Sequence, residues 1–197
     1  AIVGTSGSGK STLLNMLAGL ERPTKGEVII SGHHIEKLNE EQLVTFRREH
    51  VGFIFQSFHL LGTMDALENV ALPLSFRGEQ KEKRLKKAEK MLRLVGLEKH
   101  AKHLPKQMSG GQQQRVGVAR ALVVEPDIIF ADEPTGNLDS ASSREIMEIL
   151  KSMHRSGETL ILITHDNGIA AQAKRVVRIM DGKIESDMIN EEFVEEA

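Results

Sequence analysis

The chain has 197 residues, of which 40% are hydrophobic and 27% are charged, and its formal net charge is −2. This length accommodates one domain with a substantial buried core, and the near balance of charge gives no general electrostatic reason to bind nucleic acid. The lack of cysteine excludes disulfides, thiolate metal sites and cysteine nucleophiles. No apolar run in the sequence approaches the roughly 18 to 20 residues that cross a bilayer, so we expect a cytoplasmic location.

The first third of the chain predicts a strand, a glycine-rich loop and a helix, followed by two further strands. Residues 1–3 have the character of the end of a buried strand, residues 4–9 form the loop, and residues 10–20 predict a helix with one apolar face. The alternating, β-branched segment 27–31 and the apolar run 51–55 predict two further strands.

The middle of the chain predicts helices, and the last third alternates between strands and helices. Charged residues dominate 79–95 and apolar side chains recur there at helical spacing, which predicts a solvated helix. Nothing from residue 56 to about 109 predicts a strand. Helices are then predicted at 109–124 and 140–155, and strands at 128–132, 159–164, 175–180 and 183–186. This alternation predicts a mostly parallel sheet covered on both faces, with an inserted helical segment.

The loop at residues 4–11 matches the phosphate-binding pattern G-x-x-x-x-G-K-[ST]. Glycines let the backbone wrap closely, so that successive N–H groups and the start of the next helix converge on phosphate oxygens. Lys10 is expected to bridge the β- and γ-phosphates, and the Ser11 hydroxyl to ligate Mg²⁺. The predicted nucleotide contacts here are Gly4, Ser6, Gly7, Ser8, Gly9, Lys10, Ser11 and Thr12.

A pair of carboxylates follows the predicted strand 128–132. Asp132 falls at the carboxyl edge of the sheet, where α/β proteins bind ligands, and is suited to hold Mg²⁺. Glu133, one residue further, is placed to polarise an attacking water. Such a pair alone is equally consistent with ordinary loop carboxylates, and the glycine-rich loop gives it weight.

A second anion site is predicted at the start of the helix at 109–124. Ser109 is a good N-cap, and Gly110 and Gly111 expose the N–H groups of the first turn. One nucleotide does not need two such sites in the same subunit. The economical interpretation is that Ser109 faces a γ-phosphate held by another subunit.

Together these motifs resemble those of the ATP-binding cassette (ABC) ATPases, and the resemblance extends over the whole chain. Residues 108–112 resemble the signature motif of that family, with Met in place of the commoner Leu. Gln56 matches the glutamine that senses Mg²⁺ and the membrane partner, residues 136–139 resemble the D-loop, and residues 164–166 the switch-histidine segment. The resemblance implies catalytic roles for Lys10, Gln56, Glu133 and His165. It implies Mg²⁺ ligation by Ser11, Gln56 and Asp132, and nucleotide contacts across a dimer interface by Ser109, Gly110, Gly111, Gln112 and Asp139.

The same resemblance implies the domain plan. We expect a P-loop NTPase α/β core at residues 1–56 and 125–197, with a helical signature subdomain at 57–124. Members of the family carry an adenine-stacking aromatic, commonly Tyr, on strands upstream of the phosphate loop. This chain has no Tyr or Trp and reaches that loop after three residues. We therefore expect the N-terminal β-subdomain to be truncated here.

For function, the resemblance implies an ATP-binding and ATP-hydrolysing subunit of a membrane transporter. It would form a head-to-tail homodimer with ATP and Mg²⁺, contact a transmembrane permease at the inner face of the membrane, and bind no nucleic acid. Residues 132–139 and 66–70 look most like a branch of lipoprotein-releasing, macrolide-export and antimicrobial-peptide-resistance ATPases, which implies an exporter. The apolar residues Phe58, Leu60, Leu61 and 66–74 either offer a docking patch for the permease or pack the core of the insertion.

Two other functions remain open at this point. A regulatory scaffold of the cell-division type, which engages a membrane complex without transport, would carry the same ATPase residues. A non-transport ABC ATPase of DNA repair or translation would carry long coiled coils or two cassettes, whereas only about fifty residues separate Gln56 from Ser109 here.

Overall fold

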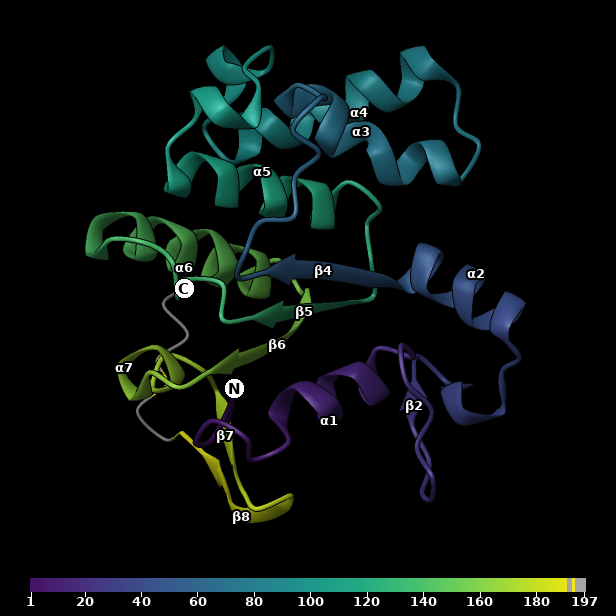
Figure 1. Cartoon of the computed structure of the whole chain (residues 1–197), viewed down its shortest axis with the longest axis vertical. Helices are drawn as coiled ribbons and strands as arrows, with labels where there is room; N and C mark the ends of the chain where they lie inside the picture. The colour runs from purple at the N-terminus through teal and green to yellow at the C-terminus, as the bar shows by residue number, and fades with distance from the viewer. Residues whose placement is uncertain (191–192, 194–197) are drawn as a thin grey trace.

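The main sheet positions most of the motifs found in the sequence. The computed structural model describes residues 1–190 and 193, and within them a six-stranded sheet runs in the order β4-β5-β6-β1-β7-β8 (Figure 1). Its strands are β1 (Ile2–Val3), β4 (Val51–Phe55), β5 (Ile128–Asp132), β6 (Thr159–Thr164), β7 (Arg175–Met180) and β8 (Lys183–Ile189). β8 pairs antiparallel with β7, and the other neighbours are parallel. The expected mixed α/β fold with a mostly parallel sheet is confirmed.

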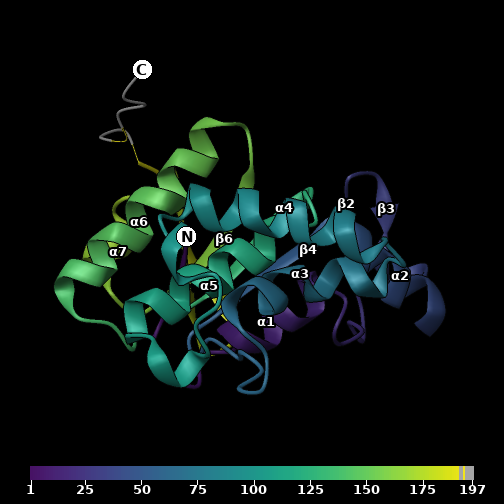
Figure 2. The same cartoon turned by 90° about the horizontal axis from the view of Figure 1, so that it is seen from above.

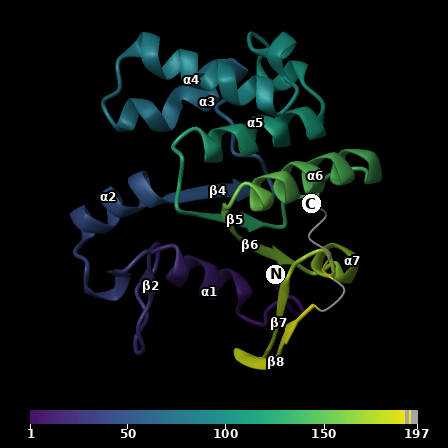
Figure 3. The same cartoon turned by 180° about the vertical axis from the view of Figure 1, so that it is seen from behind.

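Helices cover both faces of this sheet. In chain order they are α1 (Lys10–Leu17), α2 (Glu40–His50), α3 (Ala66–Phe76), α4 (Lys81–Leu94), α5 (Gly110–Leu122), α6 (Ser140–Arg155) and α7 (Asn167–Ala170). Short 3₁₀ turns occupy Ile35–Lys37, Glu98–His100 and Pro105–Gln107, and a small hairpin pairs β2 (Ile29–Ile30) with β3 (His33–His34). Figures 1 and 3 show α3, α4 and α5 gathered at one end of the molecule, with α1 and the hairpin toward the other.

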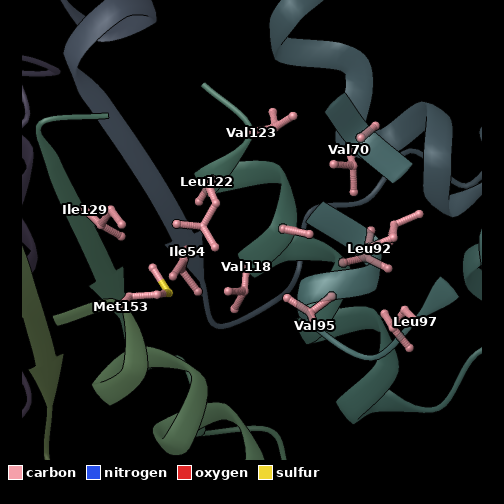
Figure 4. Packing of buried hydrophobic residues seen from close by; sticks show 14 of the residues in the cluster. Ile54, Val70, Leu92, Val95, Leu97, Val118, Leu122, Val123, Ile129 and Met153 are labelled. Atoms are coloured by element: carbon pink, nitrogen blue, oxygen red, sulfur yellow. The ribbon is translucent and has the colours of Figure 1, made fainter. Parts of the chain in front are cut away.

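The two-residue period of the strands divides the core between the faces of the sheet. Ile128 and Phe130 of β5 pack with α1 and α2, whereas Ile129 and Ala131 face the opposite way. Ile129 and Ala131 belong to the larger of two hydrophobic clusters. This cluster continues without interruption from β5 through α5 and α6 into α3 and α4 (Figure 4). Seen from above, α3, α4 and α5 therefore lie over the sheet as one packed group (Figure 2).

Most elements have the predicted bounds, and the differences have local causes. β4, β5, β6, β7 and α6 match the predictions, while α1 ends at Leu17 because Gly19 adopts a left-handed φ of 66° beyond its last turn. The sequence analysis missed α2, although Asn39 and Gln42 form a capping box at its start. Only Ile29–Ile30 of the expected strand at 27–31 is paired as a strand.

The apolar segment at 66–74 belongs mainly to the core. Five of its side chains are at most 3% exposed: Ala66, Leu67, Val70, Ala71 and Leu74. These residues therefore pack the insertion and are not available as a docking patch. Leu61, in the loop before α3, is 45% exposed and stays accessible.

Among the helices that the structure describes, none has both the length and the apolar character needed to span a membrane.

Candidate functional site

The ends of three parallel strands and the loop after a fourth meet at one edge of the sheet. Phe55 at the end of β4 is in register with Asp132 of β5, and Asp132 is in register with Ile163 of β6. Val3, just before the glycine-rich loop, pairs with Thr164. The next residue along each of these strands therefore emerges at the same edge, where parallel α/β sheets bind their ligands.

A cleft of about 640 Å³ opens at this edge. Ten of its lining residues are predicted site residues: Ser6, Gly7, Gly9, Lys10, Ser11, Thr12, Gln56, Asp132, Glu133 and His165. Ile163 also lines it and was not predicted. Segments as far apart in the chain as Ser6 and His165 thus form one site. Gly4 and Ser8 lie outside this lining.

The glycine-rich loop is held in the conformation that a phosphate cradle requires. Gly7 and Gly9 adopt left-handed φ values of 79° and 95°, which residues with a Cβ rarely adopt. Lys10 Nζ donates to the carbonyl oxygens of Gly4 (2.8 Å) and Thr5 (2.9 Å), so the ammonium lies folded over the loop.

Gly4 and Ser8 support this loop from beneath. A Cβ on Gly4 would overlap the carbonyl of Ile179, so only glycine lets β1 run into the loop at this point. Ser8 is 2% exposed; its N–H donates to Thr5 O, and its own carbonyl accepts from Gly182 N–H. Both residues therefore shape the loop instead of facing the cleft.

The two carboxylates on β5 lie side by side on the wall of the cleft. Burial, followed by the negative charge of Glu133, raises the pKa of Asp132, and the positive charge of Lys10 opposes this effect. Glu133 has a left-handed φ of 46°, a strained conformation of the kind that occurs at functional sites. His165 Nδ1 lies 2.8 Å from Glu133 Oε1, and because a carboxylate can only accept, Nδ1 is the donor.

The oxygen atoms that line the cleft around these carboxylates suit a divalent cation. The hydroxyl of Ser11, the amide of Gln56 and the carboxylate of Asp132 all line the cleft and supply the oxygen ligands that Mg²⁺ prefers. A cation there would also relieve the repulsion between Asp132 and Glu133 that raises the pKa of Asp132. The residues present therefore fit the group that the sequence implied.

The signature residues form the capped start of a helix and lie outside the cleft. Ser109 Oγ accepts from Gln112 N–H (3.2 Å) and Gln112 Oε1 accepts from Ser109 N–H (2.9 Å), which closes a capping box at the start of α5. A Cβ on Gly111 would come within 2.5 Å of Ser142 Oγ, so glycine allows α5 to touch the start of α6. Of the described residues that line the cleft, none comes from α5.

Asp139 begins α6 and makes its bonds within the chain. Its carboxylate accepts from the N–H groups of Ala141 and Ser142 and from the Ser142 hydroxyl, and these bonds, led by the Ser142 N–H, lower the pKa of Asp139. Because Ser142 also touches Gly111, the start of α6 and the start of α5 form one rigid corner.

Three residues to which the sequence analysis assigned no contact tie these motifs together; of these, Asn137 belongs to the segment that resembles the D-loop. Asn137 exchanges two hydrogen bonds with Gln56. The fully buried Gln114 of α5 donates to the carbonyl of Pro134 (2.6 Å), directly after Glu133. Arg120 donates to the carbonyls of Phe58 (2.8 Å) and His59 (2.6 Å). A polar side chain on the apolar face of the predicted helix was an available signal for Gln114.

Comparison with known proteins identifies the family. The sequence pattern described as "ABC transporter" matches residues 1–136. The chain is 51% identical over 183 residues to an uncharacterized ABC transporter ATP-binding protein, MJ1508, of Methanocaldococcus jannaschii, and the match covers 93% of this chain and 82% of that protein. It is also 51% identical over 196 residues to the macrolide export ATP-binding/permease protein MacB of Hyphomonas neptunium, where it spans 100% of this chain but 30% of that protein.

Solved structures agree in fold. The ATP-binding cassette MJ0796, in a dimeric post-hydrolysis state bound to ADP and phosphate, superposes with a TM-score of 0.87 at 43% identity, covering 98% of this chain and 85% of that chain. A second dimeric structure of the same cassette superposes equally well at 44% identity. With its phosphate loop, acidic strand end and capped signature helix, the chain belongs to the ABC transporter family as an ATP-binding domain.

Proposed function

We propose that this chain binds and hydrolyses ATP and thereby powers a membrane transporter. The observation that carries the proposal is the single cleft in which Lys10, Asp132 and Glu133 meet Ser11, Gln56 and His165. The left-handed glycines and Lys10 suit this cleft to phosphate, and the carboxylates suit it to a cation and a water. These are the groups that phosphoryl transfer to water requires.

The chain's own residues divide the work of hydrolysis. The N–H groups of the glycine-rich loop and the start of α1 bind the phosphates, and Lys10 turns from Gly4 and Thr5 to the β- and γ-phosphates. Ser11, Gln56 and Asp132 would hold Mg²⁺, which supplies charge neutralisation on the phosphates when bound.

Glu133 orients a water toward the γ-phosphorus and accepts its proton as the water oxygen bonds to phosphorus, while the bond from the γ-phosphorus to the oxygen that stays with ADP breaks. His165 donates to Glu133, which fixes the direction of that carboxylate. From this position His165 would also contact the γ-phosphate as charge develops during the transfer.

We further propose that the complete site is shared by two copies of the chain arranged head to tail. Ser109 caps a helix whose first-turn N–H groups suit an anion, yet this helix does not reach the described cleft of its own chain. A second copy would bring 109–112 to the γ-phosphate, and Asp139 would lie at the contact. The structurally similar cassette MJ0796 forms a dimer, which supports this arrangement.

The proposals for the partner and for the direction of transport rest on the relatives of this chain. The macrolide export relatives are named ATP-binding/permease proteins, and this chain spans 30% of the length of the one from Hyphomonas neptunium. We propose that the domain works with a transmembrane permease at the inner face of the membrane, as part of an exporter of antimicrobials, peptides or lipoproteins. The exposed Leu61, close to the loop that carries Gln56, supports contact with the permease on this side.

The domain plan follows from the same assignment. We propose a nucleotide-binding core at 1–56 and 125–197 and a signature subdomain at 57–124. The mutual packing of α3, α4 and α5 supports this division. The continuous hydrophobic cluster from α3 to α6 indicates that the two parts are firmly joined.

The replacement Glu133→Gln tests the hydrolytic assignment. The amide keeps the size of the side chain but loses its basicity, so ATP turnover is expected to fall about 10²- to 10⁴-fold, while ATP binding and ATP-dependent dimerisation persist. Steady-state phosphate release and sedimentation with ATP measure the two. Glu148→Gln on α6, whose carboxylate is 63% exposed and pairs with Lys151, is the matched control. Near-wild-type turnover in Glu133→Gln would overturn the assignment.

A further inference from the structure

Gln56 is held by a reciprocal pair of hydrogen bonds that no motif predicts. Asn137 Nδ2 donates to the backbone carbonyl of Gln56 (3.1 Å), and Gln56 Nε2 donates to Asn137 Oδ1 (3.3 Å). The two residues are 81 positions apart in the sequence. The pair thus joins the end of β4 to the loop that leads into α6.

These bonds determine which atom of the Gln56 side chain is left for a ligand. A backbone carbonyl can only accept, so the amide nitrogen of Asn137 must face it. The Asn137 oxygen then faces the Gln56 side chain, and an oxygen acceptor requires a donor, which is the Gln56 nitrogen. The Gln56 amide is therefore fixed with its nitrogen on Asn137, and its oxygen remains for the cleft that Gln56 lines with Asp132.

Gly136 gives Gln56 the space for this orientation. A Cβ at position 136 would come within 2.7 Å of Gln56 Nε2 and 3.3 Å of its amide carbon. Any larger residue there would push the amide away from Asn137. Gly136 and Asn137 thus act on the same atom of Gln56, one by its small size and the other by a hydrogen bond.

The far side of the Gln56 loop is anchored as well. Arg120 donates to the carbonyls of Phe58 and His59, two residues with left-handed φ values of 59° and 47°. The backbone on that side of Gln56 is therefore fixed, and the remaining freedom is the rotation of its side chain. Asn137 is the contact that restricts this rotation.

We propose that Asn137 is a positioning residue that presents the amide oxygen of Gln56 to the divalent cation of the bound nucleotide. This inference rests on the proposed function, because it takes the cleft to be a site for a metal–nucleotide complex. Asn137 lies two residues before Asp139, which is the N-cap residue of α6. The same two bonds therefore connect the metal ligand to the segment proposed to lie at the dimer contact.

The test compares nucleotide binding with and without a metal, and it needs no turnover. The non-hydrolysable analogue AMP-PNP is titrated into wild type, Asn137→Ala and Gly136→Ala, once with Mn²⁺ and once with EDTA. The Mn²⁺ electron paramagnetic resonance spectrum of each saturated complex reports the ligands directly. Asn15→Ala is the matched control, because it removes an asparagine side-chain bond to Glu21 of 2.9 Å outside the cleft.

We expect both Asn137→Ala and Gly136→Ala to weaken AMP-PNP binding with Mn²⁺ about threefold to tenfold. Binding in EDTA should stay at the wild-type value, which also shows that the variants are folded. In a double-mutant cycle, Asn137→Ala should have no further effect on the Mn²⁺-dependent affinity once Gln56 is alanine. The Mn²⁺ spectrum of Asn137→Ala should then match that of Gln56→Ala.

Two results separate the inference from the function beneath it. If wild type binds AMP-PNP more tightly with Mn²⁺ and Asn137→Ala retains the full metal effect and spectrum, or if the two substitutions are additive, the positioning role is wrong while the proposed function stands. If wild type binds AMP-PNP under neither condition, the proposed function fails first. Equal weakening of Asn137→Ala in Mn²⁺ and in EDTA assigns Asn137 a purely structural role and also overturns the inference.

Discussion

At the scale of single residues, the site contains groups held in states that they would not adopt alone. Glu133 combines a left-handed backbone with a carboxylate bound by His165. Asp132 is partly buried beside that second negative charge. Such costs are tolerated where they prepare a group for a ligand, because a bound cation or phosphate offsets them.

The raised pKa of Asp132 predicts a stability effect with a definite sign. The folded protein binds this proton more tightly than the unfolded chain does, so the free energy of unfolding falls as the pH rises from the ordinary carboxyl range through the raised pKa. Asp132→Asn should therefore melt above wild type at pH 7 in metal-free buffer. The difference should shrink as the pH is lowered toward the ordinary range for Asp, as followed by circular dichroism.

Asp187→Asn provides a control of opposite sign. The hydrogen bond from Arg175, followed by its charge, lowers the pKa of Asp187, so that carboxylate stabilises the fold above the ordinary carboxyl range. Its loss should lower the melting temperature at pH 7. A lower melting temperature for Asp132→Asn at pH 7, or a gain that is the same at every pH, would contradict the account of Asp132.

The sequence predicted the residues that line the cleft better than those that support them from behind. Asp132 ends a strand, His165 directly follows one, and Lys10 comes after the loop that follows β1; parallel strands bring such positions to one edge of the sheet. Asn137 and Arg120 act through contacts between segments far apart in the chain, and their targets are backbone carbonyls. No periodicity or spacing marks such a contact.

At the scale of elements, α5 links the whole site. Its start carries Ser109, its buried Gln114 bonds to the carbonyl of Pro134 after the acidic pair, and its Arg120 holds the loop after β4. A displacement of this helix would therefore reach three motifs at once. This connection depends on packing against β4 and α6, which the helix pattern alone does not specify.

Arg120 provides a direct test of this connection. Two carbonyls and two left-handed residues depend on its guanidinium, so Arg120→Ala is expected to lower the free energy of unfolding by about 2 to 4 kcal/mol. Arg120→Lys, with one compact donor group, should lose about half as much. Urea denaturation measures both.

Arg93→Ala is the control for Arg120, since its side chain is 71% exposed and pairs with Glu98 at the surface. Such pairs contribute at most about 1 kcal/mol. If Arg120→Ala is no more costly than Arg93→Ala, the loop after β4 is not held by α5.

The elements that were wrong or missing show where local signals fail. α2 has only two buried side chains, Leu43 and Phe46, in a strongly charged segment, so few apolar positions mark it as a helix. The hairpin strands β2 and β3 have two residues each, which is too short to show an alternation of apolar and polar residues in the sequence. β4, β5 and β6 are apolar or β-branched runs of five or six residues, α6 has a clear helical period, and the bounds of all four were predicted correctly.

At the scale of the whole molecule, the sheet separates two packed layers and leaves the cleft at one edge. The larger hydrophobic cluster joins α3, α4 and α5 to β4, β5 and α6, so the signature helix packs directly against the sheet. The signature helix nevertheless contributes nothing to the described cleft. The proposed head-to-tail pair, in which a second copy supplies Ser109, would account for this separation.

The most direct test of this central claim mixes two inactive variants. Lys10→Ala removes the ammonium of the phosphate loop. Ser109→Asp keeps a good N-cap but places a negative charge at the proposed phosphate contact. Each alone should lack ATPase activity, because both sites of its homodimer carry the defect.

Mixed in equal amounts, half of the dimers combine one copy of each variant, and one of their two sites joins an intact loop to an intact signature. The mixture should recover up to about a quarter of the wild-type ATPase rate, as expected for a two-fold shared site. A mixture with no more activity than the mean of the two separate variants would contradict the shared site.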